Sequence, residues 1–158
     1  MEFRLLTLGD ALWEPLRAYA AGCSWRAGKS LADAMGAGAF TGWERVIAAV
    51  EGETIRGYCT VASTDCIPDL PYTPYIGYVF VDEACRGRRL SERMLAFAMD
   101  YLRSAGFERA YLVSDHENLY EKYGFEVVDR RMAPWGEMEK IYMRRTLPRL
   151  DGRGIIRV

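Results

Sequence analysis

Three arginines and a glycine stand together in the segment Arg86-Gly87-Arg88-Arg89. An amphipathic run begins near Arg88, at the end of this segment. The apolar run 75–81 precedes the segment, so we expect a turn that joins a strand to a helix. The first amides of a helix have no acceptor inside it, and the helix dipole places partial positive charge there. Such a turn can bind a phosphate, and Gly87 lets the backbone approach a bulky anion. A solvated turn that only caps the helix is an equally good interpretation of the spacing.

The common nucleotide-binding and metal-binding motifs are absent from the sequence. Neither the GxxxxGK[ST] of P-loop proteins nor the GxGxxG of dinucleotide folds occurs. A phosphate-binding α/β protein of another class, built on Gly87 and the arginines, therefore stays open as a hypothesis. His116 is the only histidine, and the cysteines at 23, 59, 66 and 85 form no CxxC pair or zinc spacing. We expect no metal, and free thiols in the cytoplasm.

The segments around the turn alternate between strands and helices, which is typical of an α/β or α+β domain. Strands are predicted over residues 2–7, 44–50, 55–63, 75–81, 109–113, 125–131 and 138–146. Helices are predicted over residues 13–21, 29–37, 88–103 and 117–123. The strand 75–81 is apolar on both faces, so we expect it in the centre of a sheet, with Gly77 marking a bulge or a close approach.

Turn and cap residues predict where these elements end. Asp10 is expected to cap the first helix, while Gly106 and Gly124 end the third and fourth. Three prolines exclude regular structure over residues 64–74. We expect a single domain over residues 1–147 and a loosely held C-terminal tail over 148–158.

Length and composition fit one ordinary globular domain. The chain has 158 residues and 18.0 kDa, with 50% apolar and 27% charged residues. Its formal net charge of −1 argues against a general nucleic-acid binder. No run approaches 18 uninterrupted apolar residues and no signal peptide is recognisable, so neither a membrane span nor secretion is expected.

The segment Val81-Asp82-Glu83-Ala84-Cys85-Arg86-Gly87-Arg88-Arg89-Leu90-Ser91 resembles the acetyl-CoA-binding motif of the GNAT superfamily of N-acetyltransferases. That motif reads (Arg or Gln)-x-x-Gly-x-(Gly or Ala). Arg86 matches its first position and Ser91 fills the small last position. Arg89 stands where the second glycine usually is. There it either adds a charge-assisted contact to the phosphate or crowds the turn.

A second segment, Leu119-Tyr120-Glu121-Lys122-Tyr123-Gly124-Phe125, is similar to the tyrosine-x-x-x-Gly-Phe stretch that follows the fifth strand in these enzymes. Both segments occur in the family's order within residues 75–131. The resemblance implies the GNAT-like fold, of mixed α/β (α+β) class. Its central sheet is mixed, mostly antiparallel, has about six to seven strands, splays between strands 4 and 5, and is flanked by helices.

The resemblance also implies the reaction and the residues that carry it. An acetyl group would pass from acetyl-CoA to a primary amine by direct attack in a ternary complex. The backbone of Val79 and Val81 would pair with the pantetheine arm, with Phe80 between them facing elsewhere, and the amides from Arg86 to Ser91 would hold the pyrophosphate. Tyr120 would protonate the departing thiolate as the catalytic acid. The expected cofactor-binding residues are Val79, Phe80, Val81, Arg86, Gly87, Arg88, Arg89, Leu90, Ser91, Asn118 and Tyr120.

The general base and the acceptor stay open at this point. Asp65, Asp69, Asp115 and His116 are the candidate bases, because the strand 75–81 contains no acid. The tryptophans at 25, 43 and 135 flank the proposed cleft, although packing is the more common role of tryptophan, and the one at 13 is expected in the core. An acidic rim from the loop 64–74 would suit a cationic amine.

A non-catalytic acyl-CoA-binding or regulatory module on the same fold is the alternative to the enzyme, since a fold does not fix a function. The expected partners of the enzyme are a small-molecule or peptide amine, with no nucleic acid and no membrane. A homodimer is common in the family.

Overall fold

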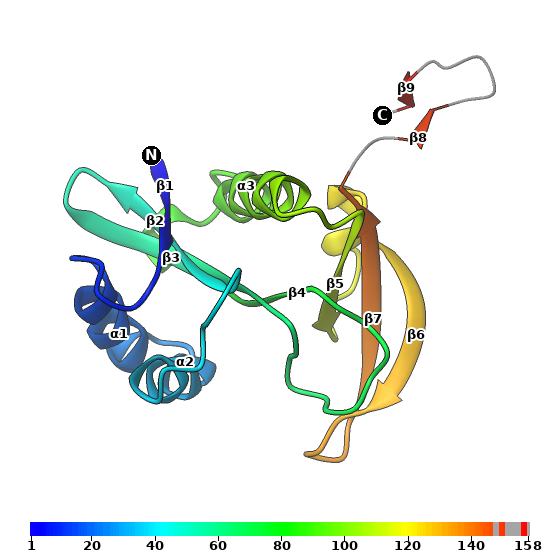
Figure 1. Ribbon diagram of the computed structural model, residues 1–158, viewed down its shortest axis with the longest axis horizontal. Coiled ribbons are helices and arrows are strands. Elements are labelled where there is room, and N and C mark those ends of the chain that lie inside the picture. The colour runs from blue at the N-terminus through cyan, green and yellow to red at the C-terminus, as the bar shows by residue number, and fades with distance from the viewer. Residues whose placement is uncertain (147–148, 151–155, 158) are drawn as a thin grey trace. The chain divides into compact units, whose positions relative to one another are not determined.

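The computed structural model describes residues 1–146, 149–150 and 156–157 (Figure 1). Regular elements follow the predicted order of strands and helices. They are β1 (Glu2–Leu6), α1 (Trp13–Gly22), α2 (Ala27–Gly36), β2 (Arg45–Glu51), β3 (Thr54–Ala62), β4 (Tyr75–Val81), η1 (Glu83–Cys85), α3 (Leu90–Ser104), β5 (Arg109–Ser114), η2 (Tyr120–Tyr123), β6 (Glu126–Met132) and β7 (Met138–Arg145), followed by the short strands β8 (Arg149–Leu150) and β9 (Ile156–Arg157).

The first seven strands form one mixed sheet in the order β1-β2-β3-β4-β5-β7-β6. The pairs β1–β2, β2–β3, β5–β7 and β6–β7 are antiparallel, whereas β4 and β5 are parallel. The parallel pair is registered at Tyr75 and Tyr111, the start of β4 and the middle of β5. Three helices flank the sheet. The predicted fold class is confirmed: a mixed α/β fold with a largely antiparallel sheet that splits between its fourth and fifth strands.

The chain divides into two compact units. Unit 1 contains residues 1–62 and 76–98, and unit 2 contains residues 63–75 and 99–158. The single domain over residues 1–147 stays a prediction. The predicted tail, 148–158, falls mostly outside the described residues, and β8 and β9 within it pair antiparallel.

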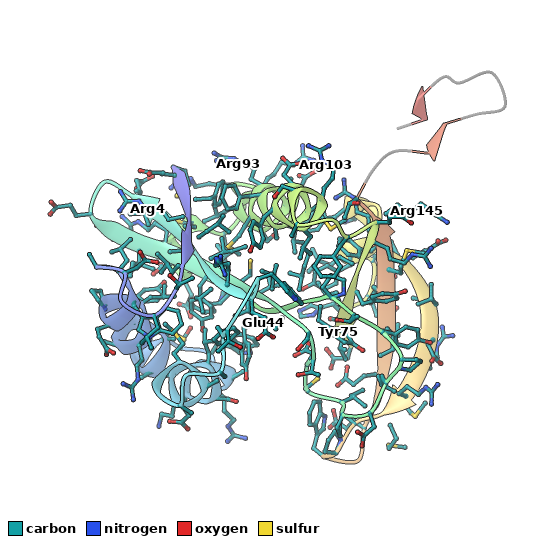
Figure 2. All side chains as sticks on the ribbon, in the orientation of Figure 1. Arg4, Glu44, Tyr75, Arg93, Arg103 and Arg145 are labelled. Atoms are coloured by element: carbon teal, nitrogen blue, oxygen red, sulfur yellow. The ribbon has the colours of Figure 1, made fainter. Side chains whose placement is uncertain are left out.

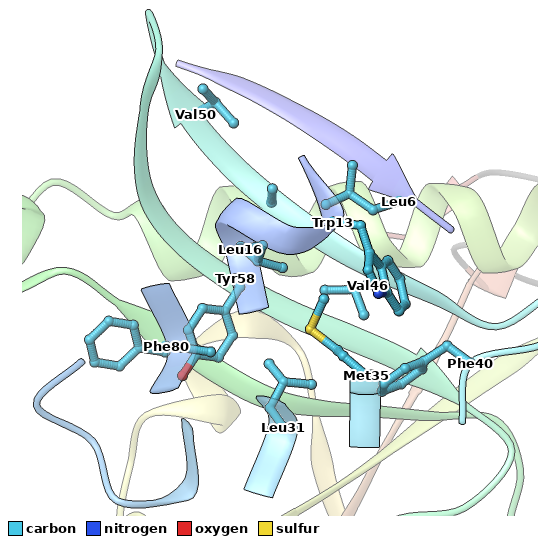
Figure 3. Close-up of a cluster of buried hydrophobic side chains, with 12 residues drawn as sticks. Leu6, Trp13, Leu16, Leu31, Met35, Phe40, Val46, Val50, Tyr58 and Phe80 are labelled. Carbon is cyan, nitrogen blue, oxygen red and sulfur yellow. The ribbon is translucent and has the colours of Figure 1, made fainter. Parts of the chain in front are cut away.

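Unit 1 buries both faces of its strands. β2 is buried from Val46 to Val50 without alternation, which requires a cover on each face. Figure 3 shows the cover of one face, where side chains of α1 and α2 pack against β1, β2 and β3. The buried members of this cluster include Leu6, Trp13, Leu16, Leu31, Met35, Phe40, Val46, Val50, Tyr58 and Phe80. On the other face, Phe3 of β1 lies 5.5 Å from Phe97 of α3, centroid to centroid.

α3 is the amphipathic helix that the sequence predicted over residues 88–103. Leu90, Met94, Ala98 and Leu102 are buried along one stripe. Arg93 and Arg103 project from its exposed side (Figure 2). The helix starts two residues later than predicted because Arg88 and Arg89 belong to the preceding turn.

Unit 2 has its own apolar cluster. Ile67, Tyr75, Tyr111, Ala133 and Ile141 are buried in it, and the partly buried Leu70, Tyr72, Val113 and Met143 pack against them. Two of these buried residues, Ile67 and Tyr75, come from the proline-rich segment and the first residue of β4. The predicted loop 64–74 has no regular structure, as expected, yet it supplies part of a core.

Three local predictions were wrong. Asp10 does not cap α1: its carboxylate accepts from the Thr7 amide at 2.6 Å, and no side chain caps the helix. The helix predicted over 117–123 is only a 3₁₀ turn over Tyr120–Tyr123, since a short polar segment cannot repay helix nucleation. The prediction that β4 is buried on both faces was wrong for its second half, where Tyr78, Val79 and Val81 are partly exposed.

Candidate active site

The turn after β4 is held in place by Asp82. One carboxylate oxygen accepts from the Ala84 amide at 2.9 Å, and the other accepts from the Tyr19 hydroxyl at 3.0 Å. The Asp82 amide in turn donates to the Arg56 carbonyl at 2.8 Å. The hydrogen bond from the Ala84 amide and, to a smaller extent, that from the Tyr19 hydroxyl hold the pKa of Asp82 below its ordinary value. β4, β3 and α1 therefore all fix the start of the turn.

Two residues of the turn have left-handed backbones. Gly87 has φ +82° and Arg89 has φ +58°. Glycine adopts this conformation without cost, whereas for another residue it costs about 1–2 kcal/mol. Arg89 is therefore an arginine in a glycine conformation, at the motif position where the family usually has glycine.

The three arginines of the turn differ in their partners. Arg88 forms an ion pair with Glu51 at 3.1 Å, and Arg89 pairs with Glu92 at 2.6 Å. Arg86 is exposed, and its charge contributes to the lowered pKa of Asp82. The guanidinium groups of Arg88 and Arg89 are thus each paired with a carboxylate.

The backbone amides around the start of α3 differ in whether they already donate to a carbonyl of the chain. The first intrahelical bond runs from the Arg93 amide to the Arg89 carbonyl at 3.2 Å, so the Leu90 amide has no acceptor inside the helix. The Arg86 amide is already used, since it donates to the Glu83 carbonyl at 3.3 Å. An anion site here would use the amides from Gly87 onward, one residue later than the sequence predicted.

The Asp82→Ala variant is expected to lose about 1 kcal/mol of unfolding free energy, because it removes the cap of η1 and the partner of Tyr19. The carboxylate's folded pKa is lowered, so its stabilisation is present above the unfolded pKa of about 3.9 and is lost as the pH falls through the folded pKa. Thermal unfolding at pH 7 and pH 3 measures this, and the exposed Asp100→Ala is the control. Equal melting temperatures for both variants at pH 7 would contradict the role of Asp82.

β4 carries a backbone irregularity next to the predicted one. Tyr78, not Gly77, has a left-handed backbone, with φ +49° inside the strand. Such strain persists only where the surroundings enforce it. The Tyr78 hydroxyl lies 2.9 Å from the Ser30 hydroxyl, and its ring meets Trp25 edge-on.

Phe80 packs in the core cluster of unit 1. It is 6% exposed, its ring stacks on those of Trp25 and Tyr58, and it meets Tyr19 edge-on. A Cβ on Gly57 of β3 would lie 2.6 Å from the Phe80 carbonyl oxygen, so this close approach requires glycine at position 57. Val79 and Val81 are partly exposed. The side chains of Val79 and Val81 thus alternate with that of Phe80, which packs in the core, and the cofactor-binding role of all three stays a prediction.

Tyr120 lies in unit 2, at the start of η2, and only 6% of it is exposed. Its ring is surrounded by those of His116, Tyr123, Phe125 and Tyr142, with centroids 5.7–6.3 Å away. Gly124 ends the turn with φ +86°, as the sequence predicted. Asn118, just before η2, is exposed and also left-handed, with φ +59°.

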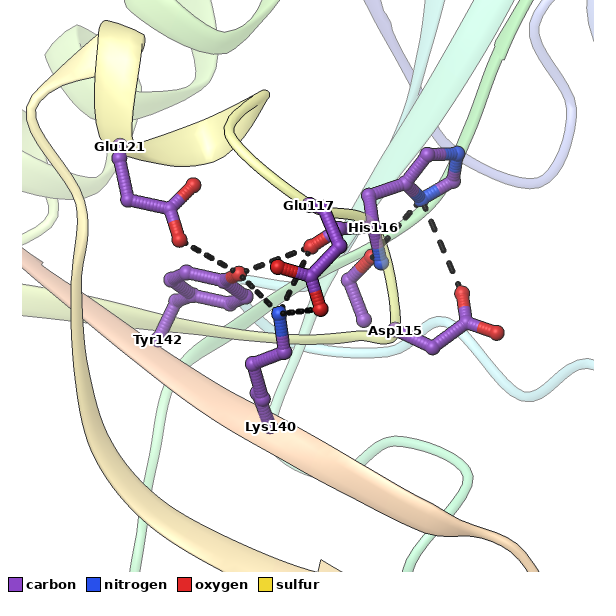
Figure 4. Close-up of polar contacts among 7 residues, drawn as sticks. Asp115, His116, Glu117, Glu121, Lys140 and Tyr142 are labelled. Atoms are coloured by element: carbon purple, nitrogen blue, oxygen red, sulfur yellow. Dashed lines mark hydrogen bonds and ion pairs between the residues drawn. The ribbon is translucent and has the colours of Figure 1, made fainter.

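A polar network lies beside this aromatic cluster (Figure 4). The Tyr142 hydroxyl donates to the Glu121 carboxylate at 3.0 Å and also lies 3.1 Å from the His116 carbonyl. Lys140 pairs with Glu117 at 3.1 Å and donates to the same carbonyl. The network ties β7 to the segment that carries Tyr120. Sequence reasoning missed Lys140 and Tyr142, because their partners are more than 20 residues away.

The four candidate bases are all in unit 2 but in different surroundings. Asp69 is exposed and left-handed, with φ +61°. Nδ1 of His116 lies 2.9 Å from the Ser114 hydroxyl. Asp65 is half-buried, and burial raises its pKa to about 6. Burial thus shifts the Asp65 carboxylate toward neutral pH.

Asp115, the fourth candidate, belongs to an acidic cluster with Glu137 and Glu139. Carboxylate oxygens of the three lie within 4.8 Å of one another. Burial raises the pKa of Glu139, and the charges of Asp115 and Glu137 raise it further. Such oxygens can accept a cation, either a metal ion or an ammonium group.

The predicted tryptophans occupy both units. Trp13 is buried in the core, as expected. Trp25 and Trp43 belong to unit 1, where Trp25 covers Phe80. Trp135, in unit 2, is 55% exposed at the turn between β6 and β7 and hydrogen-bonds to Glu139.

The geometry of the turn, with its left-handed Gly87 and Arg89 before a helix, fits the family that the sequence resembles. A family model described as the acetyltransferase (GNAT) family matches residues 7–125. The chain belongs to the GNAT acetyltransferase family. No curated protein matches its sequence.

Solved GNAT structures share the fold of this chain. The aminoglycoside 6'-N-acetyltransferase from Enterococcus faecium is 17% identical with a TM-score of 0.71, covering 96% of this chain and 100% of its own. A GNAT family N-acetyltransferase from Escherichia coli in complex with CoA is 20% identical with a TM-score of 0.70, covering 92% and 81%. A GNAT acetyltransferase from Elizabethkingia anophelis with acetyl-CoA bound is 15% identical with a TM-score of 0.65, covering 91% and 97%.

These likenesses concern the fold, and two of these GNAT structures hold CoA or acetyl-CoA. Within the described part of the chain, no helix is both long and apolar enough to cross a membrane.

Proposed function

We propose that the protein is an acetyl-CoA-dependent N-acetyltransferase that transfers the acetyl group to a primary amine by direct attack in a ternary complex. One observation carries the proposal: Arg89 adopts the left-handed backbone at the motif position where the family has glycine, next to the left-handed Gly87. Position 89 therefore has a backbone conformation that favours glycine, although its residue is arginine, and this supports a turn that can bind phosphate.

Acetyl-CoA would bind through this backbone and through β4. The amides of Gly87, Arg88, Arg89 and Leu90 would hold the pyrophosphate, since a helix start attracts anions. The exposed Arg86 would add a charge-assisted contact. The backbone of Val79 and Val81 would pair with the pantetheine arm, and the Val79 amide would polarise the thioester carbonyl.

Tyr120 would act as the general acid. The amine nitrogen forms a bond to the carbonyl carbon, and the C–S bond breaks to release the CoA thiolate. The Tyr120 phenol would give its proton to this thiolate and recover one from the nitrogen. Its burial among aromatic rings would keep water away from this transfer.

Incubation with acetyl-CoA and a panel of amines tests the proposal. The panel contains kanamycin, spermidine and a lysine-containing peptide, and thiol release and calorimetric acetyl-CoA binding are followed together. Turnover with one amine supports the enzyme. Binding without turnover favours the non-catalytic acyl-CoA-binding module, and absence of binding would contradict both.

The aminoglycoside acetyltransferase among the similar structures makes a cationic small molecule the first acceptor to test. A peptide amine is the second. The proposal includes a single catalytic domain over residues 1–147 in the cytoplasm, with no metal requirement, and a homodimer as the form to look for by light scattering.

Replacing Arg89 by glycine is expected to weaken acetyl-CoA binding about tenfold, because a full charge leaves the anion site while the backbone shape stays favourable. Arg89→Lys keeps the charge and should bind nearly as well as wild type. Arg103→Ala, at the other end of α3, controls for net charge. Calorimetry measures all three, and tighter binding by Arg89→Gly would show that the side chain obstructs the cofactor.

A further inference from the structure

Tyr120 lies in a segment of unit 2 that has little regular structure of its own. η2 is a single 3₁₀ turn over Tyr120–Tyr123, and no side chain caps it. The hydrogen bonds of a 3₁₀ turn have poorer geometry than those of an α-helix, and so short a turn contributes little stability. Asn118, just before it, has a left-handed backbone, which persists where the surroundings enforce it. Contacts from other elements are therefore needed to fix the position of Tyr120.

Two residues of β7 supply such contacts. Lys140 and Tyr142 are two positions apart on the strand, so their side chains leave the same face of the sheet. Figure 4 shows both pointing from β7 toward Glu117 and Glu121. Lys140 is paired with Ser114, the last residue of β5, so the segment that leads to Tyr120 begins directly opposite it.

Lys140 anchors the start of the segment. Its ammonium group donates to the His116 carbonyl and to the Glu117 carboxylate, both at 3.1 Å. The Tyr142 hydroxyl oxygen, at 3.4 Å, is the third acceptor, so each of the three ammonium N–H groups has a partner. Only 17% of the Lys140 side chain is exposed, and water therefore competes weakly for these bonds.

Tyr142 anchors the other end of the segment. Its hydroxyl donates at 3.0 Å to the carboxylate of Glu121, the residue directly after Tyr120. Its ring lies 5.7 Å from that of Tyr120, centroid to centroid. Tyr142 is fully buried, and a buried network whose members are all hydrogen-bonded is rigid. Tyr120 is thus held between an anchor at Glu117 and an anchor at Glu121.

We propose that Lys140 and Tyr142 are positioning residues that hold Tyr120 in the orientation that its proton transfer needs. This inference rests on the proposed acetyl transfer, in which Tyr120 is the general acid. Lys140 and Tyr142 exchange no proton with the substrate and act only through Tyr120. A general acid works within hydrogen-bond distance of the atom that it protonates, so a small displacement of its hydroxyl lowers the rate.

The test is a double-mutant cycle of Tyr142→Phe and Tyr120→Phe, assayed with the amine that the wild type acetylates. Tyr142→Phe removes the hydroxyl that holds Glu121 and keeps the ring beside Tyr120, and we expect kcat to fall about tenfold. Acetyl-CoA affinity, measured by calorimetry, should change far less than kcat, because the lost interaction serves the transition state. Without the Tyr120 hydroxyl there is no proton donor to position, so the double variant should be no slower than Tyr120→Phe alone.

Two comparisons separate positioning from a merely structural role. Tyr72→Phe also removes a hydroxyl of unit 2 that donates to a carboxylate, that of Asp129 at 2.6 Å. It should lower the melting temperature about as much as Tyr142→Phe does and keep the wild-type kcat. Lys140→Met keeps the apolar stem without the ammonium group and should lower kcat as Tyr142→Phe does, whereas Lys140→Arg keeps a charged donor and should restore part of the rate.

Each failure has a distinct signature. In an active wild type, a Tyr142→Phe variant of unchanged kcat would overturn the inference and leave the acetyltransferase in place. A double variant slowed by the product of the two single effects, or an equal loss of kcat in Tyr72→Phe, would also overturn it. A wild-type rate in Tyr120→Phe would remove the general acid and this inference, but not the acetyl transfer. Absence of transfer in the wild type would overturn the proposed function and this inference together.

Discussion

Turnover of the Tyr120→Phe variant is expected to be about 10²- to 10⁴-fold below wild type, the usual contribution of a positioned general acid. The substitution removes one hydroxyl and keeps the ring that packs among His116, Phe125 and Tyr142. Acetyl-CoA affinity and melting temperature should therefore stay close to those of the wild type. A loss of rate without a loss of binding is the pattern of an interaction made only in the transition state.

The control is Tyr123→Phe, which makes the same chemical change three residues later in the same 3₁₀ turn. Tyr123 is only partly buried, and we expect its variant to keep the wild-type rate. Steady-state kinetics of both variants, measured with the amine that the wild type acetylates, shows whether only the Tyr120 hydroxyl contributes to the rate. Near wild-type turnover by Tyr120→Phe would assign the proton transfer to water or to another residue.

Acetyl-CoA binding is expected to weaken by more than tenfold in Gly87→Glu. A Cβ on Gly87 would meet no atom within 4 Å, so the substitution causes no clash within the protein. The left-handed backbone, with φ +82°, still costs stability with any side chain. The larger effect comes from the repulsion between the glutamate carboxylate and the pyrophosphate. Two like charges about 4 Å apart repel by about 1 kcal/mol in bulk water and by about 4 kcal/mol near a protein surface.

Gly87→Gln separates these two effects, because it has the same backbone strain and nearly the same size without the charge. Calorimetric titration of both variants with acetyl-CoA at low and high salt gives the comparison. We expect glutamate to weaken binding more than glutamine, and the gap to narrow as salt screens the repulsion. Equal affinities for wild type and both variants would remove this turn from the cofactor site.

Local sequence patterns were sufficient to predict most of the strands and helices and to indicate the family. The strands, α3 and the glycine that ends η2 are where periodicity and turn residues predicted them, within about two residues. Such patterns work because they depend on neighbours along the chain: a buried stripe repeats every three to four residues, and a left-handed turn favours glycine. The order of the two motifs, together with these elements, was enough to indicate the GNAT fold.

The sequence also left errors that only packing corrects. Asp10 has the side chain of a helix cap but bonds the Thr7 amide, because the turn before α1 brings that amide closer. Gly77 suggested the irregular position in β4, yet the left-handed backbone is at Tyr78, whose hydroxyl lies 2.9 Å from the Ser30 hydroxyl and whose ring meets Trp25 edge-on. Local propensity is a weak guide wherever a distant residue supplies the competing contact.

What the sequence determined by itself is the chemistry available: an arginine-rich turn before a helix, a tyrosine in a family motif, and four possible bases. Only the tertiary structure decided the backbone conformation, the burial and the partners of these groups. It put Arg89 into a glycine-like backbone and paired its side chain with Glu92, and it half-buried Asp65, which raises the pKa of that carboxyl to about 6. Burial and electrostatic environment depend on residues that the fold brings together from distant parts of the chain, and no spacing along the sequence encodes them.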